Sequence, residues 1–272
     1  MSFSMIYGTA WKKERTQFLV TLALEKGFVA IDTANQPKHY TEPLVGESLA
    51  QFLKKGHSRD KFFIQTKFTS VDGQDHRTPY DRNATISVQV EQSIESSLKQ
   101  LHSDYVDSYL LHGPYNHPRL GDEDWEVWTA LERVYRSGKA KKIGVSNVTP
   151  FQLTELLERA TVKPTVVQNR CFAQTGWDFH VRKICQSNGI MYQGFSLLTA
   201  NPFVMEFPEV IEMAKQHNAT LAQIVFSFSR QIGMIPLTGT TDPEHMDEDL
   251  KSVHITLNSS ELEFILHCAL EQ

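Results

Sequence analysis

VAIDTA at residues 29–34 and FFIQTKF at residues 62–68 are short apolar runs with a charged side chain near the carboxyl end. YLLHGP at residues 109–114 and IGVSN at residues 143–147 follow the same pattern, with a histidine and an asparagine as the polar residue. Short apolar runs rich in β-branched and aromatic residues predict buried strands of a parallel sheet. In barrels of parallel strands the active site forms at the carboxyl ends of the strands. These runs therefore indicate both an architecture and a position for the chemistry.

Eight such runs alternate with longer segments of helical periodicity, and this alternation predicts consecutive β/α units. In segment 86–101, apolar side chains recur at the three- and four-residue spacing of one helix face. The predicted strands are Met5–Ala10, Val29–Ala34, Phe62–Phe68, Val106–His112, Lys142–Ser146, Thr165–Asn169, Met191–Ser196 and Met234–Leu237. The predicted helices are Glu14–Lys26, Leu44–Lys54, Ile86–Leu101, Glu123–Arg136, Phe151–Arg159, Phe179–Ser187, Phe207–Gln231 with a break near Asn218, Pro243–Ser252 and Ser259–Ala269.

This count of strands favours a closed (β/α)8 TIM barrel over an open doubly wound sheet. No Gly-x-Gly-x-x-Gly segment follows an early strand, which disfavours a dinucleotide-binding Rossmann fold. No linker or change of composition divides the chain. We therefore predict a single domain, an α/β barrel that spans residues 1–272.

The composition excludes several classes of protein. A net charge of −5 with scattered basic residues argues against a nucleic-acid partner, because phosphate backbones are bound by clustered lysine and arginine. No apolar run approaches the ~18 residues of a membrane span. The three cysteines lie far apart without a CxxC pair, which predicts neither a disulfide framework nor a thiolate zinc site. We expect a cytoplasmic protein without a membrane or nucleic-acid partner.

Asp32, Lys67 and His112 come at the ends of the second, third and fourth predicted strands. Since these strands are neighbours in a sequentially closed barrel, the three side chains should converge at one side of its mouth. Pairing Lys67 with Asp32 would offset the several kcal/mol that burial of a lone charge costs. A plain salt bridge and a hydrogen-bonded core histidine are the alternatives for these residues.

The ordered set of motifs resembles the aldo-keto reductase family over nearly the whole chain. The resemblance implies NADPH-dependent reduction of a small-molecule carbonyl, an aldehyde or a ketone, by a monomer, with NADH as the alternative cofactor. No His, Cys or Asp cluster has metal-ligand spacing, so we predict no metal. The matching motifs are Gly8-Thr9-Ala10-Trp11, Ala30-Ile31-Asp32-Thr33-Ala34, Val45-Gly46, Thr66-Lys67, Leu110-Leu111-His112, Gly138-Lys139, Ile143-Gly144-Val145-Ser146-Asn147 and Gln168-Asn169.

The family uses a tetrad of Asp, Tyr, Lys and His, and the resemblance places Asp32, Lys67 and His112 in it. Its tyrosine commonly comes five residues after the aspartate, which here is Pro37, whereas counting back from Val45-Gly46 leads to His39.

We favour the adjacent Tyr40 as the proton donor, with His39 as the rival. The pKa of a phenol, ~10, would be lowered by Lys67 next to it. In the implied mechanism Tyr40 protonates the carbonyl oxygen during hydride transfer, His112 orients the carbonyl, and Asp32 holds Lys67.

The resemblance also assigns the nicotinamide end of the cofactor. Ser146, Asn147 and Gln168 match the residues that hold the amide, and Phe195 occupies the place of an aromatic that stacks on the ring. The alternative for Phe195 is a core residue of a buried strand. Segment 196–199, which includes Ser196 and Leu198, resembles the loop that wraps the pyrophosphate.

The segment after the eighth strand, with Thr238, Gly239 and Thr240, resembles the loop for the adenosine phosphate. The lysine and arginine that typically bind the 2′-phosphate are missing, and Leu237 and His245 stand near their places. Each lost charge-assisted contact is worth ~1.5–3 kcal/mol, so the preference for NADPH over NADH is open.

Trp11 matches a tryptophan that lines the substrate pocket, with packing on the rim as the alternative. Gly113 stands where many relatives carry tryptophan, which predicts a wider pocket, and segments 69–82 and 113–122 are expected to complete it. Only four residues precede the first predicted strand, so side chains other than those of the family's N-terminal hairpin should close the lower end of the barrel.

Two other functions remain open. Lys67 could form a Schiff base with a carbonyl substrate, as in aldolases, which requires an unpaired and desolvated lysine. Alternatively, the chain could be a non-catalytic regulatory subunit that keeps the cofactor site while its altered loop at Tyr40 no longer supports turnover.

Overall fold

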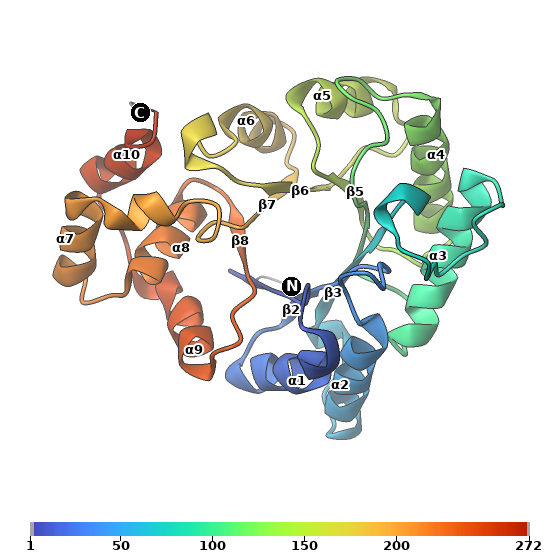
Figure 1. Cartoon of the computed structure of the whole chain (residues 1–272), viewed down its shortest axis with the longest axis horizontal. Helices are drawn as coiled ribbons and strands as arrows, with labels where there is room; N and C mark the ends of the chain where they lie inside the picture. The colour runs from blue at the N-terminus through green and yellow to red at the C-terminus, as the bar shows by residue number, and fades with distance from the viewer. Residues whose placement is uncertain (1–2, 271–272) are drawn as a thin grey trace.

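A computed structural model describes residues 3–270, in which eight parallel strands close into a barrel (Figure 1). The strands follow one another around the barrel in chain order, and β1 pairs with both β2 and β8. The predicted (β/α)8 TIM barrel is confirmed. The strands are β1 (Ile6–Gly8), β2 (Ala30–Asp32), β3 (Phe63–Phe68), β4 (Ser108–Leu111), β5 (Ile143–Ser146), β6 (Val166–Arg170), β7 (Met191–Phe195) and β8 (Ile235–Thr238).

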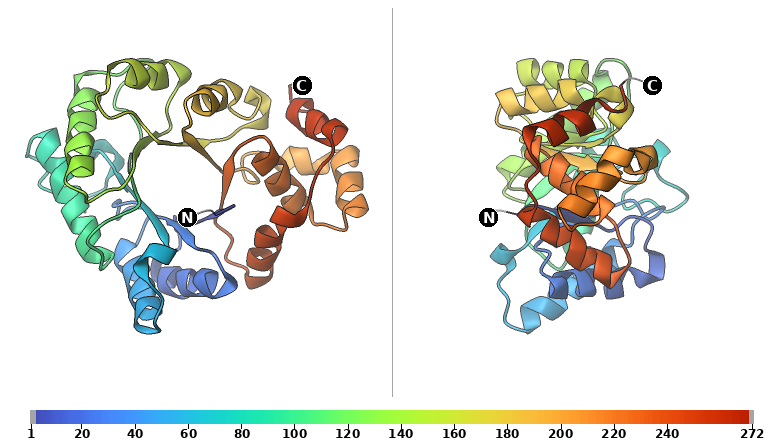
Figure 2. Two further views of the ribbon diagram at one scale, coloured as in Figure 1. Left: turned by 180° about the vertical axis from the view of Figure 1, so that it is seen from behind. Right: turned by 90° about the vertical axis from the view of Figure 1, so that its left-hand side faces the viewer.

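Helices surround the strands in both views along the barrel axis (Figures 1 and 2). The predicted break near Asn218 is confirmed, because this residue has a left-handed backbone (φ 49°) between α7 and α8. The helices are α1 (Thr16–Lys26), α2 (Glu42–Lys54), α3 (Ile86–Gln100), α4 (Asp122–Arg136), α5 (Pro150–Arg159), α6 (Phe179–Ser187), α7 (Pro208–Gln216), α8 (Leu221–Gln231), α9 (Pro243–Lys251) and α10 (Ser259–His267).

Sequence signals at the helix ends explain where several helices begin. The side chains of Thr149, Thr220 and Asn258 cap α5, α8 and α10 by accepting a hydrogen bond from the third helical N–H. Gly46 on α2 lies against the last turn of α3, since a Cβ there would fall 1.9 Å from the Gln100 carbonyl oxygen. The Val45-Gly46 motif therefore allows two neighbouring helices of the ring to approach each other closely.

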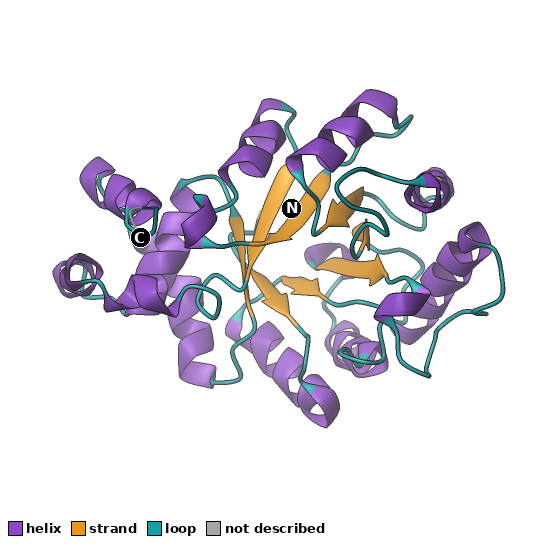
Figure 3. Cartoon of the chain, turned by 45° about the horizontal axis from the view of Figure 1, so that its top comes forward, coloured by secondary structure: helices purple, strands orange, loops and turns teal. Residues whose placement is uncertain are grey.

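Buried apolar side chains of the strands and of the surrounding helices form the main core. Figure 3 shows the strands in orange with the helices in purple around them. A second cluster lies inside the barrel at the amino ends of the strands, where Ile6, Ala30 and Phe63 are buried. Phe3 covers it, with its ring centroid 4.7 Å from that of Phe63. Phe3 and Phe63 are thus the side chains that cover this end of the barrel, in place of the family's N-terminal hairpin.

Above this cluster the interior of the barrel becomes polar. Asp32 pairs in register with Gln65, and Gln168 pairs with Gln193. Since side chains alternate between the two faces of a strand, Lys67 shares the inward face of β3 with Gln65. The sheet register thus places a layer of polar groups directly below the carboxyl ends of the strands.

Candidate functional site

Asp32 and Lys67 form a buried ion pair at the mouth of the barrel. The Lys67 Nζ atom lies 2.6 and 2.7 Å from the two Asp32 carboxylate oxygens and donates a third hydrogen bond to the Thr33 carbonyl oxygen, at 2.9 Å. Both side chains are almost fully buried. Burial lowers the pKa of Lys67, and the charge and hydrogen bonds of Asp32 oppose that effect. The predicted pairing is present, and all three ammonium protons have an acceptor.

His112 follows β4 on the same side of the mouth. Its Nδ1 atom lies 2.7 Å from the Thr69 hydroxyl oxygen, and its backbone N–H donates to the Phe68 carbonyl oxygen at 2.9 Å. Burial and the charge of Lys67 lower the pKa of His112 to about 3. The imidazole is therefore neutral at any ordinary pH. Its Nε2 atom has no hydrogen-bond partner among residues 3–270.

Tyr40 joins this cluster from the loop between β2 and α2. Its ring centroid lies 6.0 Å from that of His112 and 5.6 Å from the Lys67 Nζ atom. Burial and the nearby Asp32 carboxylate raise the pKa of Tyr40 well above its usual value. The expected net lowering of this pKa is wrong for the resting protein, because burial and the Asp32 carboxylate determine the direction of the shift. The Tyr40 hydroxyl makes no hydrogen bond within the described part of the chain.

His39, the rival proton donor, turns toward a different neighbour. Its ring lies against the Trp11 indole, with centroids 3.8 Å apart, and its carbonyl oxygen accepts from the Trp11 backbone N–H at 2.8 Å. Trp11 itself is 66% exposed. The loop thus sends two adjacent side chains in different directions, with Tyr40 beside Lys67 and His112 and His39 beside Trp11.

The residues assigned to the nicotinamide lie around the same mouth. The Ser146 hydroxyl donates to the Gln168 carbonyl oxygen at 2.6 Å, and the Asn147 amide donates to the His112 carbonyl oxygen at 2.9 Å. The Gln168 amide N–H2 donates to Asp32 at 3.0 Å and to Gln193 at 2.8 Å. The side-chain carbonyl oxygens of Asn147 and Gln168 have no partner in residues 3–270.

The two loops assigned to the phosphates lie after β7 and β8. Phe195 is half-buried at the end of β7, and it is followed by Ser196 in a left-handed backbone conformation (φ 57°) and by the half-buried Leu198. After β8, Gly239 and His245 are exposed, Thr240 is half-buried, and the buried Thr238 hydroxyl donates to Asp249 at 2.7 Å.

A carboxylate already caps the helix next to these loops. Asp242 accepts hydrogen bonds from the backbone N–H groups of Glu244 at 2.8 Å and His245 at 3.3 Å, at the first turn of α9. The amide groups at this helix end, which could otherwise bind an anion, are thus engaged by the chain itself.

Comparison with known proteins gives one family. The model described as the aldo/keto reductase family matches residues 4–269. The chain belongs to this family. The predicted enzyme class, an NAD(P)H-dependent aldo-keto reductase, is thereby confirmed.

Relatives of this aldo-keto reductase are found in a yeast and in bacteria. The "NADPH-dependent alpha-keto amide reductase" of Saccharomyces cerevisiae is 29% identical, over 97% of this chain and 85% of that protein. The "Glyoxal reductase" of Bacillus subtilis is 28% identical, over 90% and 80% of the two chains. An aldo/keto reductase from Brucella melitensis superposes with a TM-score of 0.82 at 25% identity, over 97% of this chain and 92% of that one.

One residue of this aldo-keto reductase that sequence reasoning did not single out is Lys12. Its side chain is buried, and its Nζ atom donates to the Gly239 carbonyl oxygen at 2.8 Å in the loop after β8. No carboxylate lies in salt-bridge range of it within residues 3–270. Burial and the charge of Arg15 lower its pKa to about 8. Its position directly after Trp11, in the loop that follows the strand next to β8 in a closed barrel, was the available signal.

Three glutamines below the mouth were also not predicted as a group. The Gln65 amide donates to the Asp32 carboxylate at 2.8 Å and to the Gln193 side-chain oxygen at 2.7 Å, and the Gln193 amide donates back to the Gln65 side-chain oxygen at 3.1 Å. With Gln168 they connect β2, β3, β6 and β7 across the barrel. The signal was a glutamine on the inward face of an otherwise apolar strand, two residues before Lys67.

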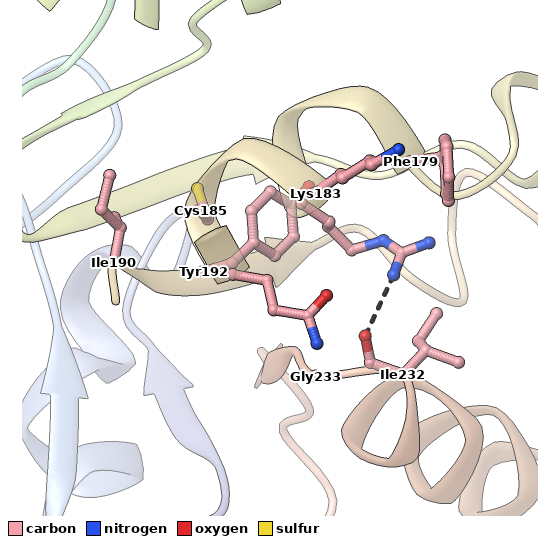
Figure 4. Close-up of a pocket in the computed structure, with 9 residues that line it drawn as sticks. Phe179, Lys183, Cys185, Ile190, Tyr192, Ile232 and Gly233 are labelled. Carbon is pink, nitrogen blue, oxygen red and sulfur yellow. Dashed lines mark hydrogen bonds between the residues drawn. The ribbon is translucent and has the colours of Figure 1, made fainter. Parts of the chain in front are cut away.

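A cavity of about 270 Å³ lies elsewhere, between α6, β7 and the turn after α8 (Figure 4). None of the four tetrad residues lines it. The guanidinium of Arg182 donates to the carbonyl oxygens of Trp177 at 2.7 Å and Ile232 at 3.0 Å, so it connects two loops. Because this cation is engaged by backbone groups, we assign no chemistry to the cavity.

Residues 3–270 contain neither a cluster of metal-ligating side chains nor a helix suited to cross a membrane. No group of three or more His, Cys, Asp or Glu side chains could hold a metal ion there. No helix in that part of the chain is long and apolar enough to cross a membrane.

Glu42 beside the site gives a pH-dependent prediction. Its buried carboxyl accepts a hydrogen bond from the Thr66 hydroxyl, and burial raises its pKa from 4.5 to about 7. Between these values the folded protein keeps a proton that the unfolded chain releases, so this group makes stability fall as pH rises. Glu42→Gln should therefore gain about 3 kcal/mol relative to the parent between pH 4.5 and pH 8. Urea unfolding of both proteins at pH 4.5 and pH 8 measures this gain. If the difference in free energy of unfolding between the two proteins is the same at both pH values, the raised pKa of Glu42 is contradicted.

Proposed function

We propose that this chain reduces an aldehyde or ketone to an alcohol, with NADPH as the hydride source and Tyr40 as the proton donor. The convergence of Tyr40 and His112 on the buried Lys67–Asp32 pair carries this proposal. We further propose a cytoplasmic, monomeric enzyme whose single domain spans residues 1–272.

The residues around the mouth fit a nicotinamide cofactor. The free side-chain oxygens of Asn147 and Gln168 are suitable acceptors for a carboxamide N–H2 group, and Phe195 offers a half-buried ring beside them. The buried Lys12, which lacks a carboxylate partner within residues 3–270, is suited to a phosphate near Gly239. When bound, the reduced nicotinamide supplies the hydride.

The tetrad side chains divide the remaining work. Because burial raises the pKa of Tyr40, its hydroxyl keeps its proton in the resting enzyme and donates it as charge develops on the carbonyl oxygen. Neutral His112 has a free Nε2 atom with which to orient that oxygen. Asp32 holds the Lys67 ammonium in place, and Lys67 stabilises the negative charge that forms on Tyr40.

An assay with NADPH and NADH over a panel of aldehydes and ketones tests the proposal directly. We expect the parent to reduce carbonyls and variants that lack a tetrad side chain to lose most of this activity. The Schiff-base alternative needs an unpaired lysine, whereas Lys67 is bound by both oxygens of Asp32. Trapping of substrate on Lys67 by borohydride would support the Schiff-base alternative and contradict our proposal. Quenching of cofactor fluorescence without reduction of any carbonyl would instead identify a regulatory subunit.

The cofactor preference depends on charges near α9. Leu237 and His245 provide no fixed positive charge, and Asp242 and Glu244 add carboxylates on the same segment. Lys12 is the buried cation next to this loop. We retain NADPH as the proposed cofactor, and comparison of dissociation constants for NADPH and NADH decides between them.

Lys12→Met is expected to weaken binding of NADPH by about 10- to 100-fold, because a charge-assisted contact with a phosphate is worth about 1.5–3 kcal/mol. Titration of the free enzyme by nicotinamide fluorescence measures the effect. Lys13→Met removes a neighbouring, exposed lysine and is the matched control. Equal affinities of the two variants would remove Lys12 from the cofactor site.

The proposed substrate pocket adjoins the tetrad. Trp11 and His39 form one wall through their contacting rings, and Gly113 directly follows His112. A Cβ at Gly113 would have only the Asn147 side chain in contact, at 3.9 Å, so this position leaves open space. We propose that this space widens the pocket for the carbonyl substrate.

A further inference from the structure

We propose that Thr69 is a positioning residue that fixes His112 in the tautomer whose Nε2 atom carries the proton. Only the consequence of this tautomer rests on the proposed reduction: the Nε2–H group would donate a hydrogen bond to the carbonyl oxygen of the substrate. The tautomer itself is a property of the free protein.

The position of the Thr69 side chain is set by its neighbours. Its backbone carbonyl oxygen accepts from the Tyr80 hydroxyl at 2.6 Å, and the Tyr80 ring packs against Phe68 with centroids 5.7 Å apart. Its methyl group lies against Gly73, where an added Cβ would come within 2.6 Å of it. The methyl and the backbone are thus held, and the hydroxyl is left facing the His112 Nδ1 atom at 2.7 Å.

Counting protons fixes the direction of this hydrogen bond. A neutral imidazole has one donor nitrogen and one acceptor nitrogen. If His112 donated from Nδ1, the hydroxyl proton of the buried Thr69 would have no acceptor within residues 3–270. If Thr69 donates instead, its proton and the Nδ1 lone pair are both satisfied, and the imidazole proton resides on Nε2.

The surroundings keep the ring neutral, as this direction requires. Lys67 and His39 are the charged or titratable groups that act on His112, and both oppose a second proton on the ring. The imidazole therefore stays neutral, and Thr69 decides which nitrogen carries its single proton. A hydrogen on Nε2 points away from Thr69, because the two ring nitrogens face different sides of the imidazole, and it has no acceptor within residues 3–270.

Two variants of Thr69 separate the hydroxyl from the rest of the side chain. Thr69→Val keeps the shape and removes the hydroxyl, whereas Thr69→Ser keeps the hydroxyl and removes the methyl. Thr78→Val is the matched control, since the Thr78 hydroxyl donates to the Tyr80 carbonyl oxygen at 3.0 Å in the same loop. Thermal unfolding of each variant shows that it folds.

Nitrogen-15 NMR of the histidine-labelled free protein, with His112 assigned by the loss of its signals in His112→Gln, reads the tautomer without any turnover. We expect the Nε2–H form in the parent, in Thr69→Ser and in Thr78→Val, and a mixture of both tautomers in Thr69→Val. In carbonyl reduction, Thr69→Val should lower kcat/KM by about 10- to 100-fold with unchanged cofactor affinity, and Thr69→Ser should restore it.

The two readouts distinguish failure of this inference from failure of the proposed function. An Nδ1–H tautomer in the parent, or the parent spectrum in Thr69→Val, overturns the role of Thr69. The expected spectra with no reduction of any carbonyl by the parent support the role of Thr69 and overturn only the proposed reaction. If Thr69→Ser loses as much kcat/KM as Thr69→Val, the role of the Thr69 hydroxyl is contradicted.

Discussion

Replacing Tyr40 with phenylalanine is expected to lower kcat for carbonyl reduction by about 10²- to 10⁴-fold, the usual contribution of a positioned general acid. The ring would still lie beside Lys67 and His112, so the variant removes one proton donor and little packing. Cofactor affinity should be unchanged. Steady-state kinetics with a saturating aldehyde, together with fluorescence titration of the cofactor, measure both quantities.

His39→Ala is the companion variant. Because the His39 ring contacts Trp11, its loss should change KM for substrates that touch the pocket wall more than it changes kcat. Full activity in Tyr40→Phe combined with inactivity in His39→Ala would reverse the assignment of the proton donor.

The second large effect is expected from Asp32→Ala. Removing the carboxylate leaves the Lys67 ammonium buried with one remaining acceptor, the Thr33 carbonyl oxygen. Breaking a buried ion pair in this way costs about 3–5 kcal/mol of the free energy of unfolding. Denaturant unfolding at pH 7 measures the loss. Activity should fall as well, because a displaced Lys67 no longer stabilises charge on Tyr40.

Two controls isolate the buried charge as the cause. Lys67→Met in the Asp32→Ala background removes the uncompensated ammonium and should recover part of the lost stability. Asp247→Ala breaks the partly exposed pair with Lys26, which should cost no more than about 1 kcal/mol. Equal losses for Asp32→Ala and Asp247→Ala would refute the importance of the buried pair.

The sequence was sufficient for the barrel because its signals are local. All eight predicted strands are present, and α6 has the predicted bounds, Phe179–Ser187. The strand that was predicted from Val106 begins at Ser108, because Val106 forms only an isolated bridge with Ala140. Strand order and alternation of side chains were also enough to bring Asp32, Lys67 and His112 to one side of the mouth.

The loop at Tyr40 shows where local signals end. Two adjacent residues could face the tetrad, and which one does so depends on how the longer loop closes over Trp11 and Gln36. The sign of the pKa shift of Tyr40 depends on whether burial or a neighbouring charge dominates, and no sequence pattern contains that balance. The contact between Lys12 and Gly239 joins residues 227 positions apart. It forms because β1 and β8 are neighbours in the closed barrel, and no local pattern in the sequence indicates it.

The aromatic closure by Phe3 and Phe63 has a consequence for engineering. The buried cluster that Phe3 covers lies below the glutamines, at the opposite end of the barrel from the tetrad. Substitutions within that cluster should change thermal tolerance while catalytic parameters stay constant. The thermal stability of the barrel can therefore be raised at the amino ends of its strands, without changing the residues that determine which carbonyl it accepts.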